Sequence, residues 1–160
     1  MNELLVRIDD CLLHAQVLLT WGTKFAPRRV VLAHDGVAAD AAQAARYRDL
    51  AEGDYEIVVQ SVSAAAAALQ SGAVVRTLVV LGSCADALRF VEAGAPVRRI
   101  QLGGLHTPGG KVLLDYIHPS AADAAALRAL LARGVELEAQ DLPASASVSV
   151  DAGSLSRLWP

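Results

Sequence analysis

Residues 4–21 read LLVRIDDCLLHAQVLLTW, and this stretch decides how the chain folds. It begins with a short continuous apolar run that is typical of a buried strand, made of Leu4, Leu5, Val6 and Ile8. Asp9 and Asp10 interrupt this run, and apolar residues then recur at helical spacing, at Leu13, Val17, Leu18 and Trp21. The break is therefore predicted to be a tight strand-to-helix loop that places His14 in the first helical turn.

The same alternation of strands and helices continues to residue 141. Further strands are predicted over residues 29–33, 55–60, 77–81, 99–102, 112–117 and 135–141. Helices are predicted over residues 39–50, 63–69, 86–93 and 120–133, the first of them opening near Asp40. Ser63 is the expected N-cap of the second of these helices, and Ser120 with Asp123 forms a capping box in the last.

This pattern predicts an α/β fold. Short buried strands that alternate with helices form an open, twisted, mostly parallel sheet with helices on both faces. Residues 1–160 are expected to make a single domain, in which the tail from about residue 143 is loosely docked. The tail is small and polar until its apolar end, at Leu155, Leu158 and Trp159.

The composition excludes several classes of partner. The chain has 160 residues, 54% of them hydrophobic, and its formal net charge of −3 argues against binding to nucleic acid. No apolar run approaches the roughly 20 residues that a membrane span needs. The start MNELLVR lacks the regions of a secretory signal, and two cysteines, Cys11 and Cys84, do not make a disulfide scaffold. The sequence therefore predicts a cytoplasmic protein.

The loops that follow the predicted strands are expected to meet at one rim of the sheet. In open parallel sheets, ligands bind at the carboxyl ends of the strands, near the point where the strand order reverses. The loops over residues 9–13, 34–36, 82–84 and 103–108 all occupy such positions. The rim residues expected beside His14 are Asp35, Ser83, Gly103, Gly104 and His106.

His14 is the first candidate for chemistry at this rim. The start of a helix presents unpaired N–H groups and the positive end of the helix dipole, which together suit a phosphate. A histidine ring there can itself accept a phosphoryl group, although a histidine that only bonds a backbone carbonyl fits the same pattern. Asp9 and Asp10 could orient the ring, while spacing alone favours Asp10 as a helix cap. Arg7, whose direction the sequence leaves open, is a candidate counter-charge.

No metal or organic cofactor is expected. Cys11 and His14 form a C-x-x-H pair, but no closed zinc pattern results from adding the other candidates, His34, Cys84, His106 and His118. The glycine-rich run QLGGLHTPGGK, residues 101–111, matches neither a P-loop nor a dinucleotide-binding fingerprint. A close approach to a ligand and a simple hairpin-like connection both explain its glycines.

The chain resembles the IIB subunit of the mannose/fructose/sorbose family of the bacterial sugar phosphotransferase system. The segment VRIDDCLLHAQVLLTWGTK, residues 6–24, is similar to the family's RIDDRLIHGQV. VVLAHDGVAAD (30–40) is similar to its second-strand segment. IQLGGLHTPGGK (100–111) is similar to its GG loop, and LRALLARGVELEAQDLP (127–143) to its last helix and strand. The resemblance therefore runs over nearly the whole chain.

This resemblance implies a phosphocarrier without a cofactor. The histidine matching His14 accepts a phosphoryl group from the phosphohistidine of a IIA partner and passes it to a sugar carried in by the membrane IIC and IID subunits. The residues expected to position the ring and the phosphate are Asp9, Asp10, Cys11, Leu13, Ala15 and Gln16. The protein would work in the cytoplasm and reach the inner membrane through IIC and IID.

Two positions depart from the family's pattern. Cys11 stands where the family has an arginine, which would donate charge-assisted hydrogen bonds to the phosphate, and Ala15 stands where it has a glycine. The departure at Cys11 supports an alternative function, a degenerate IIB-like domain that regulates or binds a partner with weak or no phosphotransfer. The sequence leaves open the sugar and the oligomeric state, a homo-oligomer included.

Overall fold

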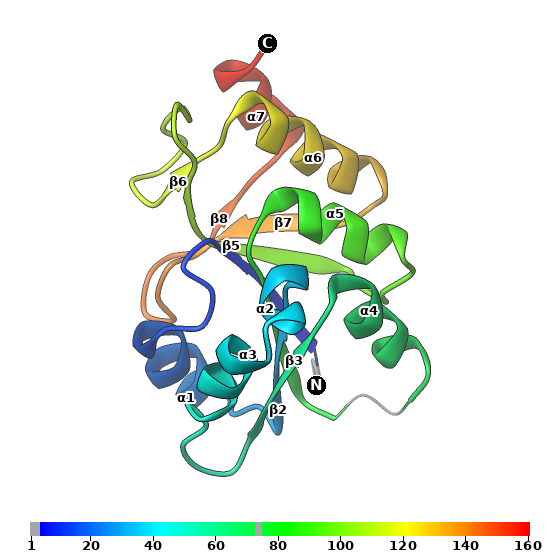
Figure 1. The fold of residues 1–160 in the computed structure, drawn as a ribbon. Helices are drawn as coiled ribbons and strands as arrows, with labels where there is room; N and C mark the ends of the chain where they lie inside the picture. The colour runs from blue at the N-terminus through cyan, green and yellow to red at the C-terminus, as the bar shows by residue number, and fades with distance from the viewer. Residues whose placement is uncertain (1–3, 73–74) are drawn as a thin grey trace.

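A single sheet runs through the protein, which is described here from a computed structural model covering residues 4–72 and 75–160 (Figure 1). Its strands are β1 (Leu4–Asp9), β2 (Arg29–Ala33), β3 (Glu56–Gln60), β4 (Thr77–Leu81), β5 (Arg99–His106), β6 (Ile117–His118), β7 (Glu136–Ala139) and β8 (Val148–Ser149). The strand order is β3-β2-β4-β1-β5-β7-β8, and β6 pairs with β5 off this path. Every pairing between these strands is parallel except that of β7 with β8. The predicted open, mostly parallel sheet is therefore confirmed.

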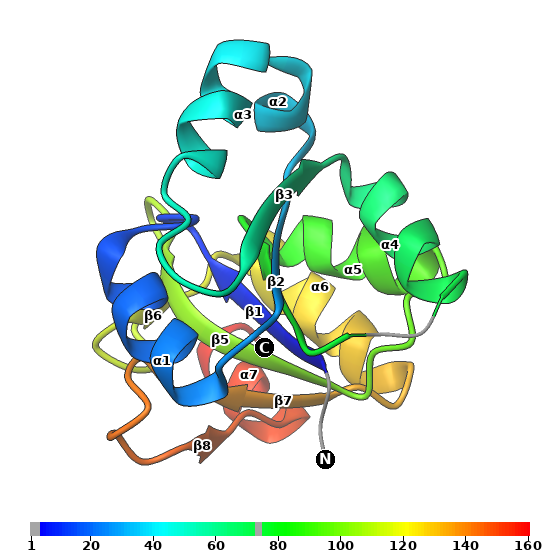
Figure 2. The ribbon, with the colours of Figure 1, turned by 90° about the horizontal axis from the view of Figure 1, so that it is seen from below.

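Helices cover both faces of this sheet, as predicted. One apolar cluster joins the sheet to α4 (Val62–Gln70), α5 (Cys84–Glu92), α6 (Ala121–Ala132) and α7 (Ala152–Leu158). A second cluster joins it to the π-helix η1 (Val17–Trp21) and to α2 (Asp35–Ala39) and α3 (Ala41–Arg48). Figure 2 shows the short helix α1 (Gly22–Phe25), which continues η1, on one side of the strands and α4, α5 and α6 on the other. In the part of the chain that the structure describes, no helix is both long and apolar enough to cross a membrane.

The helix starts differ from the prediction in three places. The predicted helix over residues 39–50 corresponds to α3 alone, with Asp40 as its N-cap, as the sequence indicates, whereas the separate helix α2 before it was not predicted. The N-cap of α4 is Ser61 and not Ser63, because the Oγ of Ser61 accepts the Ala64 N–H at 3.2 Å. Helix α5 starts at Cys84, two residues earlier than predicted, with Ser83 as its cap. The predicted capping box of Ser120 and Asp123 is present in α6.

Two strand predictions are also corrected. Strand β5 does not end at Leu102 but continues through Gly103 and Gly104 to His106. Pairing with β1 on one side and β6 on the other outweighs the weak strand preference of glycine. The strand predicted over residues 112–117 shrinks to β6, preceded by a single bridge between Leu114 and Ile117.

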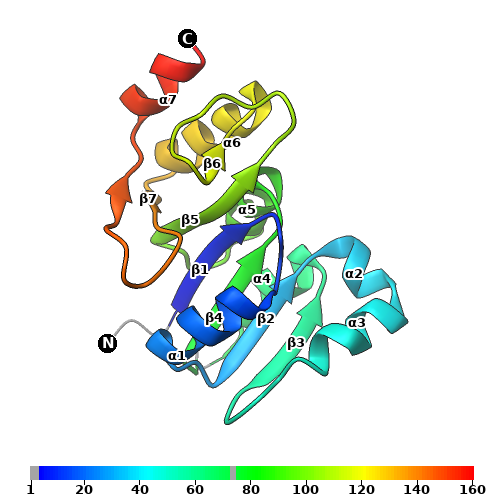
Figure 3. The same cartoon turned by 90° about the vertical axis from the view of Figure 1, so that its left-hand side faces the viewer.

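The tail from residue 143, for which the sequence suggested a loose attachment, contacts the rest of the domain at several points. Strand β8 extends the sheet beyond β7, and Leu155 of α7 is fully buried in the core. The Trp159 ring N–H donates to the carbonyl of Pro119 at 2.9 Å, and Lys111 Nζ lies 4.1 Å from the Trp159 ring centre. Figure 3 shows α7 packed beside α6 at the end of the chain. The tail therefore closes the same core that the sheet and helices form.

Candidate functional site

The site lies where connections leave the sheet in opposite directions. The loop after β1 leads to η1 on one face, while the loops after its neighbours β4 and β5 lead to α5 and α6 on the other face. In open α/β sheets, ligands bind at the carboxyl ends of the strands where connections diverge in this way. Among the predicted site residues, the structure brings together at this rim Asp9, Asp10, Cys11, His14, Gly103, Gly104 and His106.

His14 is held by a carboxylate at the start of the helical run. Its Nε2 lies 3.3 Å from Asp9 Oδ2, and its carbonyl accepts the Leu18 N–H at 3.1 Å. The imidazole is 31% exposed, while Asp9 is almost completely buried. A neutral ring that donates from Nε2 to a carboxylate keeps the lone pair of Nδ1 free. The contact therefore suits the tautomer in which Nε2 donates to Asp9, on a side chain that is partly accessible.

Arg7 lies behind Asp9 and anchors its carboxylate. Its Nη2 is 3.4 Å from Asp9 Oδ2 and donates to the Asp141 carbonyl at 3.0 Å. Its Nη1 donates to Gln101 Oε1 at 2.6 Å and to the Gln140 carbonyl at 2.9 Å. Burial lowers the pKa of Arg7, and the charge of Asp9 opposes that shift. A guanidinium nevertheless keeps its charge in proteins, so Arg7 and Asp9 form a buried ion pair.

The sequence analysis named Arg7 as a candidate counter-charge but left its direction open, although a signal for that direction exists. Side chains two apart along a strand point to the same face, so Arg7 and Asp9 had to share one face of β1. The opposite face carries Val6 and Ile8, which belong to the other apolar cluster. This alternation could have identified Arg7 as the counter-charge.

Gly103 makes room for the guanidinium. The pairing of β1 with β5 goes from Ile8 and Leu102 directly to Asp9 and Gly104, so Gly103 is an extra residue that bulges out of the ladder. A Cβ atom on Gly103 would lie only 1.9 Å from Arg7 Cζ. On Gly104 it would lie 3.3 Å from Asp9 Oδ1. The two glycines thus accommodate Arg7 and Asp9, and neither belongs to the hairpin-like connection that the sequence also allowed.

The loop after β1 is tied to the same carboxylate. Asp9 Oδ1 accepts the Cys11 N–H at 3.1 Å, and the Asp9 carbonyl accepts the Leu12 N–H at 3.0 Å. Leu12 has a φ of +58°, a left-handed conformation that is uncommon for a residue with a Cβ. Backbone strain of this kind persists where surrounding contacts enforce it, and it concentrates at functional sites. Asp9 therefore shapes the loop as well as holding the ring of His14.

Asp10 bonds to β5 and does not cap the helix, which corrects the role that spacing favoured. Its Oδ2 accepts the backbone N–H of His106 at 2.5 Å, and its Oδ1 lies 3.1 Å from His106 Nδ1. Burial acts to raise the pKa of Asp10, but these bonds from His106 outweigh it and leave that pKa below its usual value. Asp10 is consequently an ionised carboxylate beside an exposed histidine.

Comparison with known proteins identifies the family. Residues 3–155 match the family model described as the sorbose subfamily IIB component of the PTS system. The chain belongs to this family. Its members are components of the sugar-transporting phosphotransferase system, so membership implies a phosphocarrier role.

Relatives and solved structures cover almost the whole IIB chain. The fructose-specific EIIB component of Bacillus subtilis (strain 168) is 28% identical over 150 residues, 92% of each chain. The N-acetylgalactosamine-specific enzyme IIB component 2 of Escherichia coli (strain K12) is 32% identical and covers 93% of this chain and 96% of its own. The crystal structure of the IIBSor domain of the sorbose permease from Klebsiella pneumoniae superposes with a TM-score of 0.82 at 26% identity, covering 96% and 95% of the two chains.

The other predicted site residues do not contact His14 through hydrogen bonds or ion pairs among the described residues, and they lie at helix starts, in the core or at the surface. Asp35 accepts the Val62 N–H at 2.9 Å and pairs with Arg89 at 2.7 Å, and Ser83 caps α5. Leu13 is buried in the core beneath η1, and the adjoining residues Ala15 and Gln16 are exposed. Within residues 4–72 and 75–160, no hydrogen bond or ion pair joins Asp35 or Ser83 to His14.

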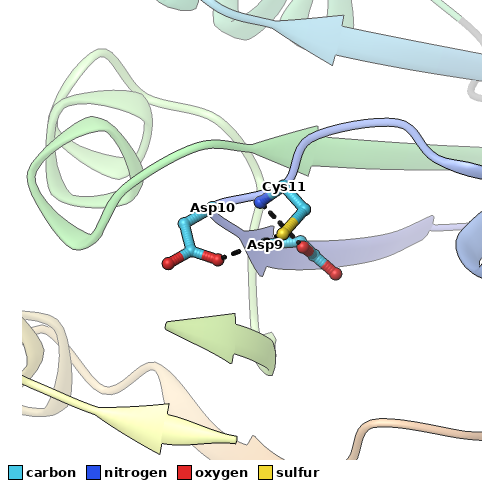
Figure 4. Close-up of side chains that lie close together, drawn as sticks. All are labelled: Asp9, Asp10 and Cys11. Atoms are coloured by element: carbon cyan, nitrogen blue, oxygen red, sulfur yellow. Dashed lines mark hydrogen bonds between the residues drawn. The ribbon is translucent and has the colours of Figure 1, made fainter. Parts of the chain in front are cut away.

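Cys11 lies beside both aspartates, as Figure 4 shows. The Sγ of Cys11 is 3.8 Å from Asp10 Oδ1. This sulfur, one carboxylate oxygen of Asp9 and one of Asp10 all lie within 4.8 Å of one another. Burial, together with the charges of Asp10 and Asp9, raises the pKa of the Cys11 thiol, which keeps it protonated near neutral pH. Because the two carboxylates already accept N–H groups from Cys11 and His106, hydrogen bonding explains this cluster and we do not assign it to a metal.

The π-helix η1 places Trp21 against the buried side chain of Arg7. The Gly22 N–H bonds to the carbonyl of Val17, five residues earlier, which defines the wide turn of η1. Trp21 lies with its ring centre 5.3 Å from Arg7 Cζ, and its ring N–H donates to the Asp141 carbonyl at 2.9 Å. Single π-turns are frequent at functional sites. Here the turn places Trp21, on the helix that follows His14, against the guanidinium of Arg7.

Proposed function

We propose that His14 accepts a phosphoryl group on Nδ1 from the phosphohistidine of a IIA partner and passes it to a sugar that enters through membrane IIC and IID subunits. The observation that carries this proposal is the contact between His14 Nε2 and Asp9, which leaves Nδ1 as the free nitrogen. A nucleophile held by a carboxylate through its second nitrogen is an established arrangement in covalent catalysis.

The transfer needs one bond to form and one to break. The Nδ1 lone pair of His14 attacks phosphorus, and the bond from phosphorus to the donor nitrogen breaks, with its electron pair returning to the donor ring. The His14 ring keeps the proton on Nε2 and gains positive charge as the new bond forms. Asp9 stabilises that charge, and the contact with Arg7 holds the Asp9 carboxylate in place. The onward step to a sugar hydroxyl runs by the same displacement, with the proton of that hydroxyl released.

Local backbone groups favour the phosphorylated state. His14 immediately precedes a helical run that starts at residue 15, and the first N–H groups of a helix have no partner within it. These groups and the positive end of the helix dipole attract an anion next to the ring. Positioning and charge stabilisation supply most of the catalysis in phosphoryl transfer, so no metal or organic cofactor is needed.

The comparisons support the partner class. The mannose-specific EIIAB component of Escherichia coli (strain K12) is 28% identical to this chain, and the match covers 84% of this chain but only 42% of the relative. Its name joins a IIA function and a IIB function in one polypeptide. We infer that a IIA protein or domain is the donor, and that the protein works as a single domain in the cytoplasm, close to its membrane partners. The relatives bear the names of several sugars, so no single sugar is proposed.

Incubation with a phosphorylated IIA protein tests this function. Mass spectrometry is expected to show the gain of one acid-labile phosphoryl group, and ³¹P–¹⁵N correlation spectra are expected to place it on Nδ1. His14→Ala should gain none, whereas His118→Gln, which changes another half-buried histidine, should gain one as the natural sequence does. If the natural sequence gains no phosphoryl group at any partner concentration, the protein is the alternative, a regulatory or binding module of the IIB type.

A further inference from the structure

An apolar groove runs beside the helix that follows His14. Its volume is about 970 Å³. On one side it is lined by Ala15, Leu18 and Leu19 of that helical run, and on the other by Leu50 and the rest of the connection between α3 and β3. Figure 2 shows this connection passing beside α1. The groove therefore begins at the residue next to the proposed phosphorylation site.

Exposed apolar side chains gather in this groove. Among the described residues, five large apolar side chains are exposed, those of Leu19, Leu50, Val75, Val112 and Val148. The first three line the groove, and Leu19, at 67%, is the most exposed of the five. Single exposed apolar residues need no explanation, whereas several that line one groove indicate a contact surface.

Transfer from a protein donor requires that protein to cover the surface around His14. The phosphoryl group can pass between two histidine rings only when they are in direct reach, and an ordinary protein contact spans about 800 Å² on each partner. Leu18 and Leu19 lie about one helical turn beyond His14. A donor that reaches His14 therefore also covers the start of the groove.

The charges around the groove favour a negatively charged partner on the side of His14. Residues 11–28 contain no aspartate or glutamate. Arg28 and Arg76 line the groove, while Glu52 and Asp54 belong to the connection on the side opposite the helix. A phosphoryl group carries nearly two negative charges, so a side without carboxylates suits the approach of a phosphorylated donor.

We propose that this groove is the docking surface for the IIA phosphohistidine donor, whose apolar side chains pack against Leu18 and Leu19 while its phosphohistidine faces His14. This inference rests on the proposed function of His14. Apolar contact at the groove buries surface that is exposed in the free chain, which favours binding beside the reacting ring. It contributes affinity for the donor and not the chemistry of transfer, so the two can be measured separately.

Leu19→Glu tests the docking surface. Because Leu19 is mostly exposed, the substitution should leave the fold intact. It removes the apolar contact and places a carboxylate in the path of the negatively charged donor. Val112→Glu is the matched control, since Val112 is 61% exposed and does not line the groove.

Two donors separate docking from chemistry. Transfer rates at increasing concentrations of a phosphorylated IIA protein that loads the natural sequence give KM and kcat. We expect Leu19→Glu to raise KM about tenfold, the usual effect of losing one important contact, with little change in kcat, and Val112→Glu to change neither. Phosphoramidate, a small donor that transfers its phosphoryl group to histidine and releases ammonia, should load all three proteins at one rate.

The outcomes that overturn the inference differ from those that refute the proposed function. An unchanged KM in Leu19→Glu overturns it, as does an equal rise in Val112→Glu, which would reflect added charge alone. Slower loading of Leu19→Glu by phosphoramidate overturns it too, because the substitution would then disturb His14 itself. If the natural sequence sediments as a dimer that Leu19→Glu converts into a monomer, a second copy occupies the groove and not the donor. Failure of the natural sequence to gain phosphate from either donor refutes the proposed function, and docking with it.

Discussion

Arg7 makes the buried carboxylate of Asp9 tolerable. Removing a charge from water is costly unless it is paired and hydrogen-bonded, and removing one partner of such a pair is strongly destabilising. The guanidinium of Arg7 meets this requirement with Asp9, Gln101 and two carbonyl groups from the loop after β7. Among the described residues, the one buried side-chain nitrogen or oxygen without a hydrogen bond is Arg7 Nε. The geometry of His14 thus depends on a residue that does not touch it.

Gly103→Ala should destabilise the protein because its Cβ would overlap the Arg7 guanidinium. We expect a loss of about 1–3 kcal/mol in the free energy of unfolding, the usual cost of overpacking. Gly104→Ala is the matched control: its Cβ meets Asp9 Oδ1 at 3.3 Å, which a small shift can relieve. Urea titration measures both. Equal stability of the two variants would show that Arg7 can move away without cost.

At the scale of elements, the helix starts position the rim. Ser61, Ser83 and Ser120 each accept an N–H of the first helical turn, in α4, α5 and α6. On the other face, the wide turn of η1 brings Trp21 over Arg7. Each of these helices starts close to the carboxyl end of a strand, so their caps hold the loops that form the rim.

Ser61→Ala and Ser63→Ala distinguish the two serines at the start of α4. The Ser61 hydroxyl accepts the Ala64 N–H, so its removal should cost about 1 kcal/mol of stability, the usual value for an N-cap. Ser63 lies inside the first turn, and its replacement by alanine should cost little or slightly stabilise the helix. Thermal unfolding of the two variants under one condition provides the comparison. A larger loss for Ser63→Ala would mean that the helix starts where the sequence pattern placed it.

At the scale of the whole molecule, the tail completes the core. Strand β8 lies antiparallel on β7, and α7 brings Leu155 into the cluster that includes α5 and α6. Contacts at the end of the tail also reach the segment between β5 and α6, through Lys111 and through the carbonyl of Pro119. The tail thus supports the segment that follows His106.

Leu155→Ala should therefore cost about 2–5 kcal/mol in the free energy of unfolding, the range for removing a buried leucine side chain. Val148→Ala, at an exposed position of β8, is the control and should change stability little. Urea titration measures both, and a loss below 1 kcal/mol for Leu155→Ala would restore the view of a loosely docked tail.

Sequence alone determined the fold class and the position of the candidate histidine. The continuous apolar runs of β1, β2 and β4 and the capping box of α6 are local patterns, readable because strand and helix periodicity depend on neighbouring residues. The interruption at Asp9 and Asp10 between two such patterns likewise placed His14 next to a strand end.

Only the tertiary structure decided what surrounds His14. The partners of Arg7 come from positions 101, 140 and 141, Asp10 meets His106, and the space for the guanidinium depends on Gly103. These contacts join residues more than 90 positions apart, and no local pattern records which strands will be neighbours. The strand order of the sheet creates them, because it places β5 beside β1 and β7 beside β5.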